Sequence, residues 1–196
     1  KQGGLYVFTP TITAENGYWY RGTADAIYQN LDFLKRCHEP YEIITSGDAV
    51  YKMDYNKVLE YHIAKKADIT VVCKELGPNE DASRFGTIKM NDSMRIEEFE
   101  ETGEAKKQSG IHGDIHFNKN FLKKYLEDDA KDETSSHDFG KNIIPKMLAD
   151  KARLYSYAFD GYWKDVGTIE SLWQANMDLL QDQPPFELNG DWKIYS

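Results

Sequence analysis

Two aspartates stand where apolar segments of the chain end. Asp48 closes the tripeptide Ser46-Gly47-Asp48 directly after the apolar run 41–45, and Asp165 follows an aromatic-rich run within 161–168. Ligands of α/β folds lie beyond the carboxyl ends of the strands, and carboxylate oxygens suit hard divalent cations. The pair therefore predicts a metal site that acts on a phosphorylated substrate. The alternative is that Asp48 caps a turn and Asp165 caps the helix that follows it.

Two other short segments carry residues suited to phosphate binding. Gly22-Thr23 opens a predicted helix, and the free amides at a helix start attract anions. A plain helix entry explains the same two residues. Lys164, next to Asp165, either contacts a phosphate or is a solvated surface charge. Both alternatives stay open for each segment.

Three potential metal ligands alternate along one segment. His112, Asp114 and His116 would point to the same face of a strand. Their types suit zinc or another transition metal, but one short strand rarely supplies a complete ligand set. A polar strand face is the simpler interpretation, and the sequence does not decide between the two.

Strand-like and helix-like segments must position these residues, and they alternate along the chain. The runs 41–45 and 68–73 read as buried strands, and Asp54 is the predicted N-cap of a helix between them. Segments 86–90 and 94–99 read as a hairpin. Later elements are a helix over 138–149, a strand over 154–159 and a helix over 168–180. This order predicts an α/β fold with a mixed, mostly parallel sheet flanked by helices.

Composition narrows the classes of protein. A net charge of −9 argues against nucleic-acid binding, because phosphate backbones require a basic surface. Cys37 and Cys73 have no metal-like spacing and are expected to be reduced thiols. No apolar run approaches the roughly 18 residues of a membrane-spanning helix, and the first residues show no signal-peptide pattern. A cytoplasmic protein without a membrane partner is expected.

Six motifs, taken together and in order, resemble the bacterial glucose-1-phosphate adenylyltransferases that supply glycogen synthesis. The motifs are WYRGTADAIYQN (19–30), SGD with YKMDY (46–48 and 51–55), SRFG (83–86), SSHDFGK (135–141), YWKDVGT (162–168) and LWQANMDLL (172–180). Each motif alone is weak evidence. Their common order along nearly the whole chain is strong evidence.

The resemblance implies a Rossmann-like nucleotidyltransferase domain. Such an enzyme transfers adenylyl from ATP to glucose 1-phosphate, releases pyrophosphate and uses Mg²⁺, which in this chain Asp48 and Asp165 would hold. Tyr20, Gly86 and Glu101 would line the sugar-phosphate side, and Gly22-Thr23 would lie near the nucleotide. The family also implies a homo-oligomer or a complex with a sister subunit.

The chain departs from the family pattern at several positions. The family's glycine-rich phosphate loop has no counterpart in it. Glu101-Thr102-Gly103 replaces Glu-Lys-Pro, so the lysine expected to meet the sugar phosphate is absent, and Ile111 replaces a sugar-contacting serine. We therefore expect an N-terminally truncated catalytic domain over 1–181, weak or inactive by itself. Residues 182–196 would form a linker and the start of a missing C-terminal domain.

Two alternative functions fit the same motifs. One is a non-catalytic regulatory or sugar-phosphate-binding subunit of the same family, which would keep the fold without the phosphate loop. The other is a nucleotidyltransferase for another sugar nucleotide, because the part that reads the base lies largely in the missing strands.

Overall fold

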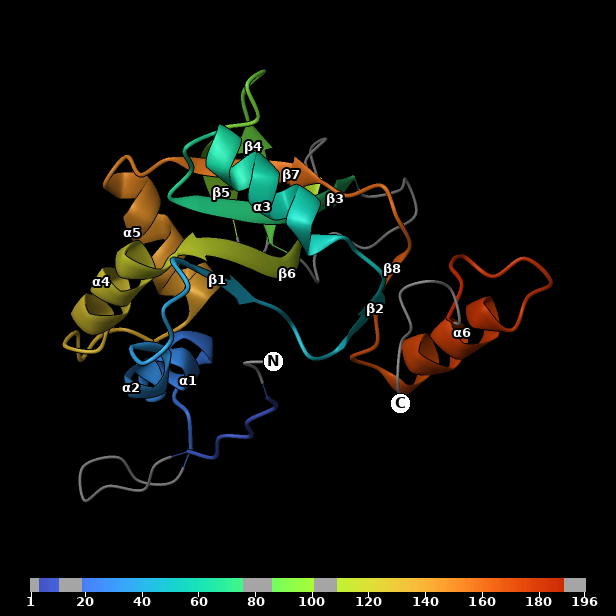
Figure 1. Ribbon diagram of the computed structural model, residues 1–196, viewed down its shortest axis with the longest axis horizontal. Coiled ribbons are helices and arrows are strands. Elements are labelled where there is room, and N and C mark those ends of the chain that lie inside the picture. The colour runs from blue at the N-terminus through green and yellow to red at the C-terminus, as the bar shows by residue number, and fades with distance from the viewer. Residues whose placement is uncertain (1–3, 11–18, 76–85, 101–108, 189–196) are drawn as a thin grey trace.

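A six-stranded mixed sheet forms the centre of the molecule (Figure 1). The computed structural model describes residues 4–10, 19–75, 86–100 and 109–188. The strands are β1 (Tyr41–Ile44), β2 (Ala49–Tyr51), β3 (Ile69–Glu75), β4 (Thr87–Met90), β5 (Ile96–Glu100), β6 (Ser109–Asn118), β7 (Leu154–Ala158) and β8 (Trp163–Asp165). The helices are α1 (Thr23–Tyr28), α2 (Leu31–Leu34), α3 (Tyr55–Ala64), α4 (Lys119–Asp129), the π-helix η2 (Phe139–Ile143), α5 (Ile144–Ala149) and α6 (Ile169–Leu179).

Strand β6 organises the sheet. It pairs antiparallel with β3 on one side and with β1 and β4 on the other, while β3 and β7 pair in parallel. The α/β class and the mixed sheet flanked by helices are confirmed. The strand pairs are mostly antiparallel, however, whereas a mostly parallel sheet was expected. β1 and β3 run in the same direction, but β6 lies between them, so β3–β7 is the one parallel pair in the described part of the sheet.

The two faces of the sheet differ in polarity. Along β3 and β6, alternate side chains such as Val71 and Phe117 enter the main core, which α4, η2 and α5 cover. The opposite face lies under α3, where Val58 and Val72 form a smaller apolar cluster. On this same face the strands also carry buried polar residues, namely Thr70, Asp114 and His116.

Local sequence signals set the helix ends. The Asp54 side chain accepts a hydrogen bond from the Asn56 amide at the start of α3, as predicted. The helix expected over 138–149 is present as η2 followed by α5, and Pro145 is tolerated because it lies in the first turn of α5. Helix α6 begins at a Thr168 capping box. The helix cap considered for Asp165 is therefore formed by Thr168 instead.

A two-stranded antiparallel ribbon, β2–β8, leads from the sheet to α6 at the side of the molecule (Figure 1). The ribbon exists because the chain leaves β1 through the Asp48 turn and returns, more than a hundred residues later, along β8. Within the described ranges, no helix combines the length and the apolar composition that crossing a bilayer requires.

Candidate functional site

A cavity of about 450 Å³ opens where β1 ends. Thr45 and Ser46, the residues that follow β1, form part of its wall. The sequence-predicted site residues Thr23 and Gly86 also line it, although 63 positions separate them in the chain. The remaining lining residues are Ala26, Ile27, Ile44, Phe99, Ile115, Asp138, Phe139, Gly140 and Ile144. The cavity lies at the carboxyl end of a strand, as expected for ligand sites in α/β folds.

Asp138 and Phe139 are cavity residues that the sequence-based prediction treated as a simple helix start. Asp138 does cap η2, because its Oδ1 accepts hydrogen bonds from the amides of Gly140 (2.8 Å) and Lys141 (3.1 Å). The signal for a second role was present, since both residues belong to the SSHDFGK motif. A residue can cap a helix and line a cavity at the same time.

Gly22 and Thr23 join α1 to the start of η2. The Thr23 hydroxyl donates to Asp138 Oδ2 (2.9 Å) and accepts from the Phe139 amide (3.1 Å). The amide of Ala24, one residue further, donates to the His137 carbonyl (2.9 Å). This carbonyl therefore occupies part of the helix start that was predicted to face a phosphate.

The His137 carbonyl is itself held by a buried network. His137 Nδ1 lies 2.8 Å from Asp129 Oδ2, and the Ser135 hydroxyl donates to the other carboxylate oxygen at 2.7 Å. The Ser135 oxygen also accepts from the His137 amide (2.9 Å). His137 adopts a positive φ of 54°, which this network must hold in place. The wall of the cavity is thus fixed from behind by hydrogen bonds.

Asp48 and Asp165 come together on the β2–β8 ribbon. Ala49 is the register partner of Asp165, and the Val166 amide donates to the Asp48 carbonyl (2.9 Å). The two aspartates are therefore diagonal neighbours across the ribbon, although 117 positions separate them in sequence. Asp48 is exposed and Asp165 is half-buried. The ribbon thus brings together the backbones of the two aspartates that the sequence singled out.

Both aspartates also make local turn contacts. The Ser46 hydroxyl donates to Asp48 Oδ1, and the Gly167 amide donates to Asp165 Oδ1 (3.0 Å). Turn capping, the alternative interpretation for Asp48, is therefore present. It does not conflict with metal binding, since each carboxylate offers two oxygens with several acceptor positions.

The donor set suits Mg²⁺ better than a transition metal. No group of three or more His, Cys, Asp or Glu side chains in the described ranges converges on a point that could hold a metal ion. Mg²⁺ is commonly held by one or two carboxylates and completes its shell with water and substrate phosphates. Asp48 and Asp165 fit that pattern.

Three other predicted site residues lie elsewhere or outside the description. The Tyr20 hydroxyl accepts from Asn30 Nδ2 (3.2 Å), beside α1, and Tyr20 is not among the residues that line the cavity. Lys164 Nζ lies 3.6 Å from the Asp178 carboxylate on α6. Glu101 falls outside the described residues. The structure thus gives Lys164 an ion-pair partner without testing its predicted contact with phosphate.

The segment with alternating His and Asp residues is buried. Asp114 and His116 are each 1% exposed, whereas the side chain of His112 lies outside the description. Burial raises the pKa of Asp114 to about 6 and lowers the pKa of His116 to about 4, the latter with a further contribution from His62. Neither ring nitrogen of His116 has a hydrogen-bond partner in the described chain.

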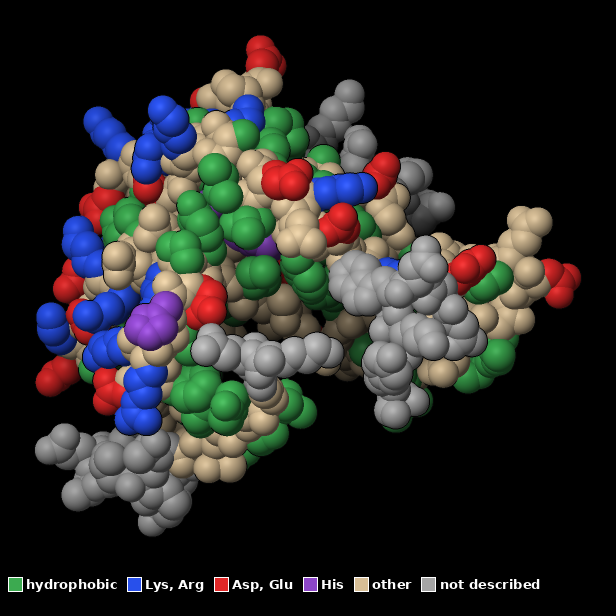
Figure 2. All heavy atoms as spheres, in the orientation of Figure 1, with side chains coloured by type: hydrophobic (Ala, Val, Ile, Leu, Met, Phe, Trp, Pro, Cys, Tyr) green, Lys and Arg blue, Asp and Glu red, His purple; other side chains and the backbone are tan. Residues whose placement is uncertain are grey.

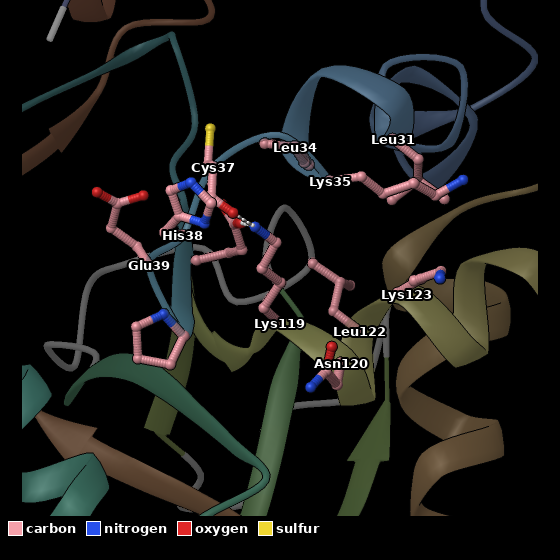
Figure 3. A pocket seen from close by; sticks show the side chains of 12 residues that line it. Leu31, Leu34, Lys35, Cys37, His38, Glu39, Lys119, Asn120, Leu122 and Lys123 are labelled. Carbon is pink, nitrogen blue, oxygen red and sulfur yellow. Dashed lines mark hydrogen bonds and ion pairs between the residues drawn. The ribbon is translucent and has the colours of Figure 1, made fainter. Parts of the chain in front are cut away.

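A second cavity, of about 390 Å³, lies between α2 and α4 (Figure 3). Figure 2 shows basic side chains gathered on this side of the molecule. They are neutralised locally, because Lys119 pairs with Glu42 (3.6 Å) and donates to the Cys37 carbonyl (2.6 Å). Lys35 and Lys123 share Glu127 at 3.9 and 3.7 Å. This cavity is therefore a weaker candidate for a phosphorylated ligand.

The fold agrees with the comparison with known families. The nucleotidyl transferase family profile matches residues 3–182, so the chain belongs to the nucleotidyl transferase family. It is 50% identical over 198 residues to the glucose-1-phosphate adenylyltransferase of Clostridium novyi (strain NT), covering 100% of this chain and 52% of the relative. The Bacillus cytotoxicus enzyme of the same name is 48% identical over 196 residues, covering 99% and 52%. The chain spans about half the length of the curated relatives it matches.

Proposed function

We propose that this chain is part of an enzyme that transfers adenylyl from ATP to glucose 1-phosphate, giving ADP-glucose and pyrophosphate for glycogen synthesis. In this reaction a phosphate oxygen of the sugar phosphate attacks the α-phosphorus of ATP, and the bond from that phosphorus to the pyrophosphate oxygen breaks. Membership in the nucleotidyl transferase family and the names of the relatives support the proposal. The observation that supports it best is the register of β2 and β8, which brings the backbones of Asp48 and Asp165 next to each other, two residues beyond the cavity-lining Ser46.

The chain's own residues would mainly position the substrates, since phosphoryl transfer depends on alignment and charge neutralisation. Asp48 and Asp165 would hold Mg²⁺, which supplies positive charge against the phosphates when bound. Thr23 and Gly86 would form the cavity wall against the substrate, with Gly22 setting the entry of α1. Tyr20, Glu101 and Lys164 are proposed to contact the sugar phosphate.

The assembly and the division of the chain belong to the same proposal. We take residues 1–181 as catalytic domain and 182–196 as a linker toward a further domain. The complete protein would work in the cytoplasm as a homo-oligomer or with a sister subunit, as the resemblance implies.

One observation favours the second candidate function, a non-catalytic sugar-phosphate-binding subunit. The residues that line the main cavity in the described chain include neither Lys nor Arg. A triphosphate site normally relies on such cations. In a binding subunit this deficit would abolish turnover while leaving recognition of the sugar intact.

Pyrophosphate release from ATP and glucose 1-phosphate with Mg²⁺ distinguishes the two candidates, measured on the natural full-length protein that carries these residues. Asp48→Asn and Asp165→Asn should each lower kcat on the order of a hundredfold or more. Asp160→Asn, an exposed aspartate shortly before β8, is the matched control and should retain full activity. A folded protein that binds glucose 1-phosphate by calorimetry but releases no pyrophosphate would establish the binding subunit instead.

A further inference from the structure

A buried carboxyl group lies next to the segment that carries Asp48. Asp114 on β6 is 1% exposed, and its Oδ1 accepts a hydrogen bond from the Tyr51 hydroxyl (3.1 Å). The backbone N–H of Ser46 also interacts with this carboxyl group and favours its ionised form. The second oxygen, Oδ2, has no hydrogen-bond partner in the described chain.

A buried carboxyl group with one unpartnered oxygen lowers the stability of the folded protein, so stability does not explain its presence. Burial of a carboxylate without an ionic partner disfavours its charged form, and it raises the pKa of Asp114 to about 6. A hydrophobic side chain of similar size would usually be neutral or stabilising at such a position. The position of the two partners suggests what the carboxyl group does instead.

The two partners lie on either side of Asp48. We define the Asp48 loop as residues 46–51; Ser46 begins it and Tyr51 ends it. Ile44 pairs with Ile115 across β1 and β6, which places Asp114 under the start of this loop. The Tyr51 hydroxyl also lies 2.6 Å from the Tyr55 hydroxyl in the first turn of α3. Both ends of the loop, Ser46 and Tyr51, therefore interact with Asp114 on the sheet.

The end of the Asp48 loop is also linked to the strand that carries Asp165. Tyr51 pairs with Trp163, and Ala49 pairs with Asp165, across the β2–β8 ribbon. A shift of Tyr51 would therefore displace both strands of the ribbon and, with them, Asp48 and Asp165. Groups behind a metal ligand commonly set its orientation in this way.

We propose that Asp114 is a positioning residue for the metal-binding carboxylates, because it anchors both ends of the Asp48 loop through Ser46 and Tyr51. The inference rests on the proposed metal site at Asp48 and Asp165. It extends that site by a buried residue on β6, which contacts neither substrate nor metal.

The test measures Mn²⁺ binding by electron paramagnetic resonance on the natural full-length protein, so that it is independent of turnover. Asp114→Leu should weaken Mn²⁺ binding about tenfold, the lower end of effects seen for groups behind a metal ligand. Asp114→Asn keeps an acceptor oxygen and should recover most of the affinity. Tyr51→Phe removes one hydroxyl without changing the carboxyl group and should weaken binding about threefold.

His116→Leu is the matched control. His116 lies two residues further on the same strand and the same buried face, and neither of its ring nitrogens makes a hydrogen bond in the described structure. It should leave Mn²⁺ affinity unchanged, whereas Asp48→Asn should abolish specific binding. Urea unfolding of every variant separates positioning from stability, because a purely structural role would change the free energy of unfolding but not the affinity of the folded protein.

The outcomes separate this inference from the proposed function. Mn²⁺ binding that depends on both Asp48 and Asp114, without pyrophosphate release, would support the positioning role and refute the adenylyl transfer. Normal turnover with unchanged Mn²⁺ affinity in folded Asp114→Leu and Tyr51→Phe would overturn the positioning role alone. If Tyr51→Phe folds and Asp114→Leu does not, the Mn²⁺ affinity of Tyr51→Phe decides whether the positioning role holds. Absence of Asp48-dependent Mn²⁺ binding in the wild type would overturn the inference as well.

Discussion

Gly22 lies against the backbone of His137. A β-carbon added to Gly22 would come within 2.4 Å of the His137 carbonyl oxygen and 2.5 Å of the Ser136 carbonyl oxygen. The φ of Gly22 is −170°, which any residue adopts, so the requirement for glycine is one of space. The contact joins α1 to the wall of the cavity.

Gly22→Ala should therefore destabilise the protein by about 1–3 kcal/mol, the usual cost of overpacking. Backbone atoms cannot move away as a flexible side chain can. Urea unfolding measures the change. Gly47→Ala is the control, since an added β-carbon there meets nothing within 4 Å. Equal stability of the Gly22 and Gly47 variants would contradict the close approach.

The hydrogen bond between Thr23 and Asp138 should contribute to stability through coupling of distant segments. Thr23→Val removes the hydroxyl at nearly constant volume, and it should cost about 1 kcal/mol, as for a typical hydrogen bond. A double-mutant cycle with Asp138→Asn isolates the pair. A coupling energy near zero would show that the hydrogen bond between Thr23 and Asp138 does not stabilise the contact between α1 and η2.

Asp114 should make stability fall as the pH rises. Its pKa is about 6 in the folded protein and 3.8 in the reference state, so the folded state holds more protons between these values. The free energy of unfolding should decrease from pH 4 to pH 6, by at most about 3 kcal/mol, and stay at the lower level above pH 6.

Comparison with Asp114→Asn isolates this contribution. The difference in unfolding free energy between variant and wild type should grow in favour of the variant between pH 4 and pH 6. A difference independent of pH would show that the buried carboxyl group titrates near its ordinary value.

His116 should have the opposite effect. Burial and nearby His62 lower its pKa from 6.5 to about 4, so the unfolded state binds the proton first as the pH falls. Stability should drop between pH 6.5 and pH 4, by up to about 3 kcal/mol. His116→Leu should remove this part of the acid sensitivity in urea titrations at several pH values. An unchanged acid slope in the variant would count against a buried neutral imidazole.

Local patterns in the sequence determined much of this structure. Asp54 capped α3 as predicted, and the hairpin of β4 and β5 formed around residues 91–95. Such signals are readable because caps, turns and hydrophobic alternation depend on neighbours within a few residues. The motifs that indicated the nucleotidyl transferase family were local in the same sense.

Only the tertiary structure decided which distant segments meet. The sequence indicated parallel neighbours for β1, but β6 inserts beside it, because pairing partners are chosen by packing across the whole sheet. It predicted that Asp48 and Asp165 form a pair, but it could not show how the chain brings them together; the β2–β8 register makes their backbones neighbours. It left Asp114 as part of a polar strand face, and burial gave that residue its altered pKa and its contact with Tyr51. Residue types fix which chemistry is available, whereas long-range packing fixes which groups share a site and how much water they keep.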